Sequence, residues 1–539
     1  MLRYRRFHLF RSHALLTAIL FASLAASAQS TGKPKKTNSA TAEERATRDF
    51  DAVRLNPLQL REFLYRMPKG ADLHYHLTGG VYAESWIRAG AEDHLCVNLS
   101  TLAFVKSAAP GDAAAPACGQ GQVPAAQAFT DQHLYDALID SFSMRSFVPS
   151  AGVSGHDHFF DTFAKFSGTA PGHIPEWLDE AATRAAAQNE QYLELMETPD
   201  FSHAAAMAAA EGWNDDFSKM RADLLAHGLR DDVAAAGAHF DQAEAAREKL
   251  EHCGQPDAAA ACRVEIRFLY QVLRGLPKHI VFAQALLAFE VASKDPRVVG
   301  INFVMPEDGY ISMQDYALHM KMVGFLHSEY PQVHISLHAG ELAPGLVPYE
   351  GLCCHIRLAI EQAHAERIGH GVDVMYENHP YDLLREMAVK HVMVEINLTS
   401  NDVILGVKGN DHPFPIYRKF HVPVALSTDD EGVSRIDLTH EFVRAVETYN
   451  LTYAELRQLV RTSLEHSFLP GASLWRSEDN FTRPVAACSE DALEDEKPSS
   501  ACAEFLQSSE KARQQWELER RFREFEASFC TPGGRFKPP

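Results

Sequence analysis

The sequence lacks three features that would point to particular classes of protein. None of its nine cysteines forms a Cys-x-x-Cys pair, so a thiolate zinc site of that kind is excluded. No basic cluster with interleaved aromatics occurs beyond the extreme N-terminus, and the formal net charge is −21. We therefore expect no nucleic acid partner. The apolar run at residues 14–26 is too short to span a membrane.

The N-terminal segment is typical of a secretory signal. Four arginines precede the apolar run, and the small residues Ala26-Ser27-Ala28 follow it. We predict a signal peptide at residues 1–28, with an uncleaved anchor as the alternative, and hence an exported protein, periplasmic or extracellular. Such a protein has no membrane contact once the signal is removed. Residues 29–54 are polar and predict a disordered leader.

The cysteine content suits an oxidising compartment. Two pairs bracket short segments and should act as disulfide staples, Cys96 with Cys118 and Cys253 with Cys262. The adjacent Cys353 and Cys354 are not expected to share one ordinary structural bridge; a core position or a free thiol is the expectation. Because nine is an odd number, at least one thiol should be free.

Eight apolar segments predict strands, and helical patterns lie between most of them. The strands are expected at 71–77, 192–196, 264–269, 298–304, 334–338, 367–374, 392–397 and 422–427, with helices such as 278–292, 313–328 and 351–365. This alternation favours an α/β fold, a parallel (β/α)8 TIM barrel. A doubly wound open sheet is the alternative, but it would not normally place polar residues at so many strand ends. The barrel should cover residues 55–474, with an insertion at 91–175 after strand 1 and a C-terminal helical extension at 475–539.

The active site of such a barrel lies at the C-terminal ends of its strands. His74 and His76 end the first strand, and their two-residue spacing puts both imidazoles on one face. His338 ends the fifth strand and Asp429 the eighth. Three histidines and one aspartate suit zinc, with one position left for water.

Other polar residues stand beside this set. Glu341 follows His338 by three residues, His370 ends the sixth strand, and the small Gly340 lets a substrate approach the backbone. An imidazole beside a carboxylate is what a metal-assisted proton-transfer site needs. A carboxylic acid kept protonated in a dry site can deliver a proton, and Glu341 is the candidate.

These residues resemble the ordered motifs of the adenosine deaminase family over about residues 67–432, and the secreted branch that includes the adenosine-deaminase-related growth factors is the most similar. The motifs are Leu-His74-Tyr-His76-Leu-Thr-Gly-Gly, Ser-Leu-His338-Ala-Gly-Glu341, Arg-Ile-Gly-His370-Gly and Ser-Thr-Asp429-Asp430. The resemblance implies that His74, His76, His338 and Asp429 bind one zinc ion. It further implies that Glu341 protonates the purine, His370 orients or deprotonates the attacking water, and Asp430 hydrogen-bonds the base. His76 and Gly340 are also expected at the substrate.

The implied activity is an exported, zinc-dependent conversion of adenosine and 2′-deoxyadenosine to the inosines and ammonia by hydroxide attack at C6. A small purine nucleoside is then the partner, and a homodimer is left open. The alternatives are deamination of methylthioadenosine or AMP, and a nucleoside-binding, growth-factor-like protein with little turnover. A binuclear amidohydrolase would need a lysine at the end of strand four, and residues 298–308 contain none.

Two departures and two decoys accompany the resemblance. Thr78 stands where many members carry an acidic or amide residue, and residues 302–307 lack the Gly-Asp-Glu often seen there, which puts the sugar contacts in doubt. His156 and His158 share the two-residue spacing of the first-strand pair, but we expect them to have structural or lid contacts. Glu194 and Glu197 on the second strand should be solvated or should support the site indirectly.

Overall fold

The computed structural model describes residues 41–106, 118–493 and 497–529. The predicted signal peptide lies outside these residues. Part of the predicted disordered leader is instead helical, since α1 covers Ala42–Val53. Its Phe50 is fully buried and packs against the rings of Phe63 and Tyr453, with centroid distances of 5.4 and 6.2 Å. The leader prediction was wrong here because contacts distant in sequence stabilise a helix that its own composition does not favour.

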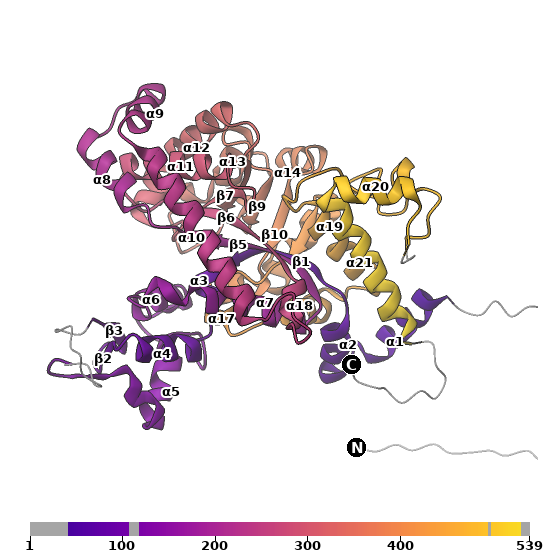
Figure 1. Cartoon of the computed structure of the whole chain (residues 1–539), viewed down its shortest axis with the longest axis horizontal. Coiled ribbons are helices and arrows are strands. Elements are labelled where there is room, and N and C mark those ends of the chain that lie inside the picture. The colour runs from indigo at the N-terminus through magenta and orange to yellow at the C-terminus, as the bar shows by residue number, and fades with distance from the viewer. Residues whose placement is uncertain (1–40, 107–117, 494–496, 530–539) are drawn as a thin grey trace, which may run out of the picture. The chain divides into compact units, whose positions relative to one another are not determined.

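Eight parallel strands form one sheet in their order along the chain (Figure 1). They are β1 Gly70–His76, β5 Glu190–Glu197, β6 Glu265–Leu273, β7 Val298–Val304, β8 His334–Ala339, β9 Arg367–His370, β10 Met393–Ile396 and β11 Val424–Leu426. The two ends of the sheet meet where Tyr75 pairs with Asp429 and the His76 N–H donates to the Asp429 carbonyl at 3.1 Å. The sheet therefore closes into a (β/α)8 TIM barrel, which confirms the predicted fold class.

Helices surround the barrel and connect its strands (Figure 1). They are α2 Pro57–Arg66, α3 Leu77–Gly80, α4 Ala83–Glu92, α7 Ile174–Ala187, α8 Ser202–Glu211, α9 Phe217–Ala226, α10 Leu229–Leu250, α11 Lys278–Ala292, α12 Tyr310–Glu329, α13 His355–Glu361, α14 Pro380–Val389, α15 Leu398–Leu405, α16 Phe414–Lys419, α17 Glu431–Ser434, α18 Leu438–Tyr449 and α19 Tyr453–Glu465. Short 3-10 turns occur at η1 Ala125–Phe129, η2 Pro171–His173, η3 Ala260–Arg263, η4 Tyr349–Leu352, η5 Val374–Tyr376, η6 Gly409–Asp411 and η7 Ala486–Cys488. The helix predicted at 278–292 coincides with α11.

The helix predicted at 351–365 is replaced by η4 and the short α13. Cys353 and Cys354, which lie between them, form a disulfide with each other, with a Cα–Cα distance of 3.7 Å. The expectation that they would not share a bridge was wrong. Cys354 has φ +84°, a left-handed conformation that an α-helix cannot accommodate, so α13 begins only after this residue.

The segment between α4 and α7 contains a small antiparallel sheet and two α-helices. Its strands are β2 Cys96–Asn98, β3 Ala103–Val105 and β4 Gln122–Pro124, and its helices are α5 Gln132–Ser141 and α6 Gly155–Lys165. The predicted Cys96–Cys118 disulfide closes this sheet, and the predicted Cys253–Cys262 disulfide closes the loop after α10. Figure 1 shows α4, α5, β2 and β3 grouped beside the barrel, with α6 nearer to it.

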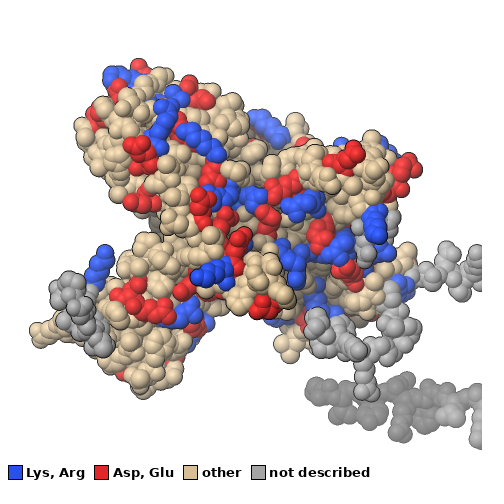
Figure 2. Space-filling model, in the orientation of Figure 1, with Lys and Arg blue, Asp and Glu red and all other residues tan. Residues whose placement is uncertain are grey.

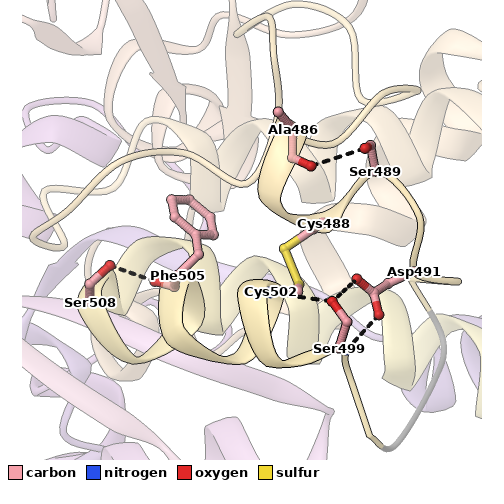
Figure 3. The surroundings of a disulfide bond; sticks show 8 residues. All are labelled: Ala486, Cys488, Ser489, Asp491, Ser499, Cys502, Phe505 and Ser508. Carbon is pink, nitrogen blue, oxygen red and sulfur yellow. Dashed lines mark hydrogen bonds between the residues drawn. A yellow bond between two sulfur atoms is a disulfide. The ribbon is translucent and has the colours of Figure 1, made fainter.

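The C-terminal segment carries α20 Ser500–Ser508 and α21 Glu510–Ala527. A disulfide joins Cys488 to Cys502, and Ser499 caps α20 while its hydroxyl donates to Asp491 at 2.8 Å (Figure 3). Phe525 of α21 packs edge-on against Phe63 at 5.1 Å, so this helix contributes to the main hydrophobic core.

Surface charge and hydropathy agree with the composition. On the face shown in Figure 2, Lys and Arg side chains are intermixed with Asp and Glu, and they form no extended basic area there. Among the described residues, no helix combines the length and apolar character needed to cross a membrane.

Candidate active site

Four side chains predicted as metal ligands converge at the C-terminal ends of β1, β8 and β11. The Nε2 atoms of His74 and His76 each lie 3.1 Å from Nε2 of His338. Oδ1 of Asp429 lies 3.3 Å from Nε2 of His74 and 3.2 Å from that of His76. Asp429 has φ +64°, an uncommon conformation for a residue other than glycine that turns the chain at the end of β11.

The other ring nitrogen of each histidine is held by an acceptor. Nδ1 of His74 lies 2.6 Å from Glu395 Oε2, and Nδ1 of His76 lies 2.8 Å from Gln271 Oε1. Nδ1 of His338 lies 2.8 Å from Asn302 Oδ1. In the neutral rings the protons therefore sit on Nδ1, and three Nε2 lone pairs face one another.

This arrangement fits a bound cation. Nitrogen atoms 3.1 Å apart that point their lone pairs at one another repel unless a positive charge lies between them. Zinc with ligands at about 2.0–2.1 Å in a tetrahedron has ligand–ligand separations of about 3.3–3.4 Å, close to the 3.1–3.3 Å found here. The set is a candidate zinc centre, and its hydrogen-bonded carboxylate and amides are the kind of support that orients metal-binding histidines.

Glu341 is placed by the tight turn that follows β8. Gly340 has φ +74°, and a Cβ there would lie 2.4 Å from Asp373 Oδ1, so the turn requires glycine. The Glu307 carboxylate accepts the backbone N–H groups of Gly340 at 3.0 Å and of Glu341 at 2.8 Å. Burial, with the negative charges of Asp429 and Glu307, raises the pKa of the Glu341 carboxyl well above its ordinary value. Such a carboxyl can hold a proton for transfer.

His370 is the last residue of β9, which ends four residues before the end of the strand predicted at 367–374. Its φ of +68° and that of Gly371, +57°, take the chain out of the extended conformation. Nε2 of His370 lies 3.7 Å from Glu341 Oε1 and 3.8 Å from Asp429 Oδ2. This buried nitrogen has no hydrogen-bond partner, so it can contact a group that enters the site.

Asp430 begins the short helix α17 beside the metal-ligand candidates. Its Oδ1 is buried and lacks a hydrogen-bond partner. Burial raises the pKa of this carboxyl to about 7, opposed by the neighbouring His76 and reinforced by the charge of Asp429. A Cβ on Gly79 would lie 1.5 Å from this oxygen, so the Gly79 position must lack a side chain.

A cavity of about 400 Å³ lies beside the site, with His76, His338, Glu341, Asp429 and Asp430 on its wall. Its apolar lining includes Phe159, Phe160, Phe163, Leu273, Met305 and Ile404. Thr78 also lies on the wall, and no Lys or Arg does so among the described residues. Met305 has φ +85°, a rare conformation for a bulky residue that places backbone strain at the cavity rim.

The decoys have other roles. His156 Nε2 lies 2.9 Å from Asp308 Oδ1, and His158 Nε2 donates to the Ser143 carbonyl at 3.1 Å. Glu194 is fully buried and forms an ion pair with Arg367 at 2.6 Å, so it supports the barrel interior rather than meeting solvent.

Sequence reasoning missed the residues that hold the site in place. They are Gln271, Asn302, Glu307, Glu395 and Asn401, together with His412. A carboxylate within an apolar strand was a usable signal for Glu395, which lies in the segment 392–397 predicted as a strand. The amides carry no comparable signal, because their partners lie far away in the sequence.

Known proteins are similar to this chain in sequence and in fold. A family model described as adenosine deaminase matches residues 178–476, more than half of the chain. An adenosine deaminase of Clostridium perfringens is 37% identical over 135 residues, which span 25% of this chain and only 37% of that relative. Two solved structures are also similar. An adenine deaminase from Arthrobacter aurescens has a TM-score of 0.48 at 17% identity, and the match covers 75% of this chain and 94% of the adenine deaminase chain. An N6-mAMP deaminase from Arabidopsis has a TM-score of 0.48 at 18% identity, and the match covers 76% of this chain and 96% of the deaminase chain.

Proposed function

Because this chain belongs to the adenosine deaminase family, we propose that it is a zinc-dependent aminohydrolase that converts adenosine and 2′-deoxyadenosine to inosine or 2′-deoxyinosine and ammonia. The observation that carries the proposal is the convergence of His74, His76, His338 and Asp429, in which each histidine of β1 lies 3.1–3.3 Å from both His338 and Asp429, beside a cavity walled by Glu341 and Asp430. Nε2 of the buried His370 lies behind that wall, 3.7 Å from Glu341. A binding protein without turnover would have no need of a buried, protonated carboxyl aimed at its ligand.

The side chains divide the reaction between them. His74, His76, His338 and Asp429 would hold the zinc ion. When bound, zinc supplies the Lewis acidity that makes water nucleophilic near neutral pH. Glu341 donates its proton to the purine ring nitrogen as the water oxygen adds to C6.

His370 and Asp430 act on the reactants from either side. Nε2 of His370 faces the space between Glu341 and Asp429, where the attacking water would stand. The unpartnered Oδ1 of Asp430 hydrogen-bonds a nitrogen of the base and fixes its orientation. The apolar wall excludes bulk water and gives the ring a surface to pack on.

The cavity favours a nucleoside over a nucleotide. Proteins that bind phosphate monoesters ordinarily use arginine, lysine or a helix N-terminus for the dianion. The described cavity wall offers no Lys or Arg, and its titratable groups are the candidate ligands His76 and His338 and three carboxylates. A phosphate there would be desolvated without a cationic partner, at considerable cost.

Export is proposed on independent grounds. The basic and apolar N-terminal segment has the pattern of a secretory signal. Eight of the nine cysteines form four disulfides, which persist in oxidising compartments and are rare in the cytosol.

The test is a direct assay of the purified protein after metal analysis. Adenosine, 2′-deoxyadenosine, methylthioadenosine and AMP would be compared by ammonia release and by the ultraviolet spectrum of the product. We expect about one zinc per chain, with a much higher kcat/KM for the nucleosides than for AMP. Preference for AMP, or zinc-loaded protein inactive on all four compounds, would contradict the proposal.

A further inference from the structure

A directed chain of hydrogen bonds leads from a backbone amide to His370. The N–H of Phe414 donates to Nδ1 of His412 at 3.1 Å. Since a backbone amide can only donate, Nδ1 of His412 is the acceptor, and the proton of the neutral ring must sit on its Nε2. Burial lowers the pKa of His412 to about 3, which agrees with a neutral ring.

The next two links transmit this polarity. Nε2 of His412 lies 2.9 Å from Oδ1 of Asn401, so the histidine donates and the amide oxygen accepts. The same amide presents its Nδ2 to Nδ1 of His370 at 2.8 Å. Turning the Asn401 amide over would place its NH2 against the N–H of His412, so the backbone amide of Phe414 also determines the amide orientation.

The last link determines the chemistry that His370 presents. Its Nδ1 accepts from Asn401, so the ring proton occupies Nε2, the nitrogen that faces Glu341 and Asp429. We propose that His412 and Asn401 are positioning residues that hold His370 in the Nε2–H tautomer, so that it enters the reaction as a hydrogen-bond donor. This inference rests on the proposed function for its catalytic meaning, but not for its geometry.

The helix α15 gives this arrangement a further consequence. Consecutive residues on it, Ser400 and Asn401, contact Asp429 and His370 respectively, since Ser400 Oγ donates to Asp429 Oδ2 at 2.7 Å. One helical turn therefore orients both a candidate metal ligand and the neighbouring histidine. His412 lies beyond this helix and just before α16, and its ring nitrogens bond to Asn401 and Phe414 rather than to the metal-ligand candidates. It acts only through Asn401.

Two matched substitutions test the polarity of the chain. Asn401→Asp preserves size but replaces the donor NH2 with an acceptor, which draws the His370 proton to Nδ1. His412→Gln can keep an N–H donor facing Asn401, whereas His412→Glu of the same length offers an acceptor. In serine proteases the wrong tautomer of a histidine costs about 10⁴ in kcat, so we expect kcat to fall on the order of 10³–10⁴-fold in Asn401→Asp and His412→Glu.

His412→Gln should lose less than about tenfold, since the polarity of the chain is kept, and KM should change far less than kcat in all three variants. Zinc content should stay at the wild-type value. His319 on α12 provides the control, because it is equally buried and neither ring nitrogen has a hydrogen-bond partner. His319→Gln and His319→Glu make the same substitutions at a buried histidine outside the hydrogen-bond chain, and neither should alter kcat.

A spectroscopic measurement of the His370 tautomer tests the inference without an activity assay. In ¹⁵N-histidine-labelled holoprotein, the signals absent from a His370→Asn variant identify His370. Wild type should show a protonated Nε2 and an unprotonated Nδ1, and Asn401→Asp should show the reverse. Three results would overturn the inference. The first is a protonated Nδ1 of His370 in wild type, and the second is a folded, zinc-loaded Asn401→Asp variant with kcat within tenfold of wild type. The third is an equal loss of kcat in His412→Gln and His412→Glu. Wild-type protein inactive on every nucleoside but with the predicted tautomer would refute the proposed function alone.

Discussion

Replacing Glu341 with glutamine should separate proton delivery from metal binding. The amide keeps the size and hydrogen-bonding capacity of the side chain but cannot transfer a proton to the purine. Loss of general acid catalysis typically costs about 10²–10⁴-fold, equivalent to about 3–5 kcal/mol of transition-state stabilisation. We expect a loss at the upper part of this range, because Glu341 is only 7% exposed and bulk water has little access to replace it as the acid.

The same substitution should leave the fold and the metal nearly unchanged. Glu341 lies outside the four candidate ligands, and its turn is held through backbone N–H groups that glutamine retains. Because burial raises the pKa of this carboxyl, a neutral acid is exchanged for a neutral amide. We expect a change of about 1 kcal/mol or less in the free energy of unfolding.

Steady-state kinetics, zinc analysis and binding of a non-hydrolysable purine nucleoside would be measured on the same preparations. Glu465→Gln is the matched control, because Glu465 is also buried, its pKa is also raised by burial, and it accepts hydrogen bonds from Ser473 and Gln515. It lines a separate depression together with His334 at the start of β8, on the opposite side of the barrel. Near-normal deamination by zinc-loaded Glu341→Gln would refute the assignment of Glu341 as the acid.

Three other predictions follow from the same site. His76→Ala or Asp429→Ala should reduce bound zinc from about one per chain to little or none, as measured by atomic absorption. Full zinc occupancy in either variant would contradict the ligand assignment. Glu395→Gln should weaken zinc binding about 10–100-fold in a chelator competition, because it loses the carboxylate that faces Nδ1 of His74; unchanged affinity would show that this contact is dispensable. Asp430→Asn should raise KM as well as lower kcat, because its expected partner is the base itself, and a change in kcat alone would argue against that contact.

The barrel and its converging residues could be predicted because both depend on local pattern. The segments of β1, β8 and β11 combine apolar residues with polar ones at or just after their C-terminal ends, and a TIM barrel brings all such ends to one face. The candidate ligands at these strand ends are therefore recognisable one strand at a time. The helix at 351–365 was wrong for a local reason that composition does not show, the bond between Cys353 and Cys354.

The supporting residues could not be predicted because their roles depend on long-range partners. Glu395 meets His74 across 321 positions of sequence, and Asn401 meets His370 only because α15 begins directly after β10. Asparagine and glutamine side chains each carry a donor NH2 and an acceptor oxygen. Their contribution here depends on which of their two polar atoms faces the histidine, and only the folded hydrogen-bond network decides that.

The turn after β8 shows how neighbouring residues can carry separate functions. His338 and Glu341 are three positions apart, yet each has its own support: Asn302 accepts from the His338 ring, while Glu307 accepts from the backbone beyond it. The pKa of Glu307 is lowered to about 2, against its burial, by His355 and Arg274, so it stays ionised and keeps accepting. The metal-facing histidine and the proton donor are thus oriented by different partners on the same segment. Because the two supports are distinct, a substitution at Glu341 need not disturb the ligand, which is why zinc retention with lost turnover is the decisive result.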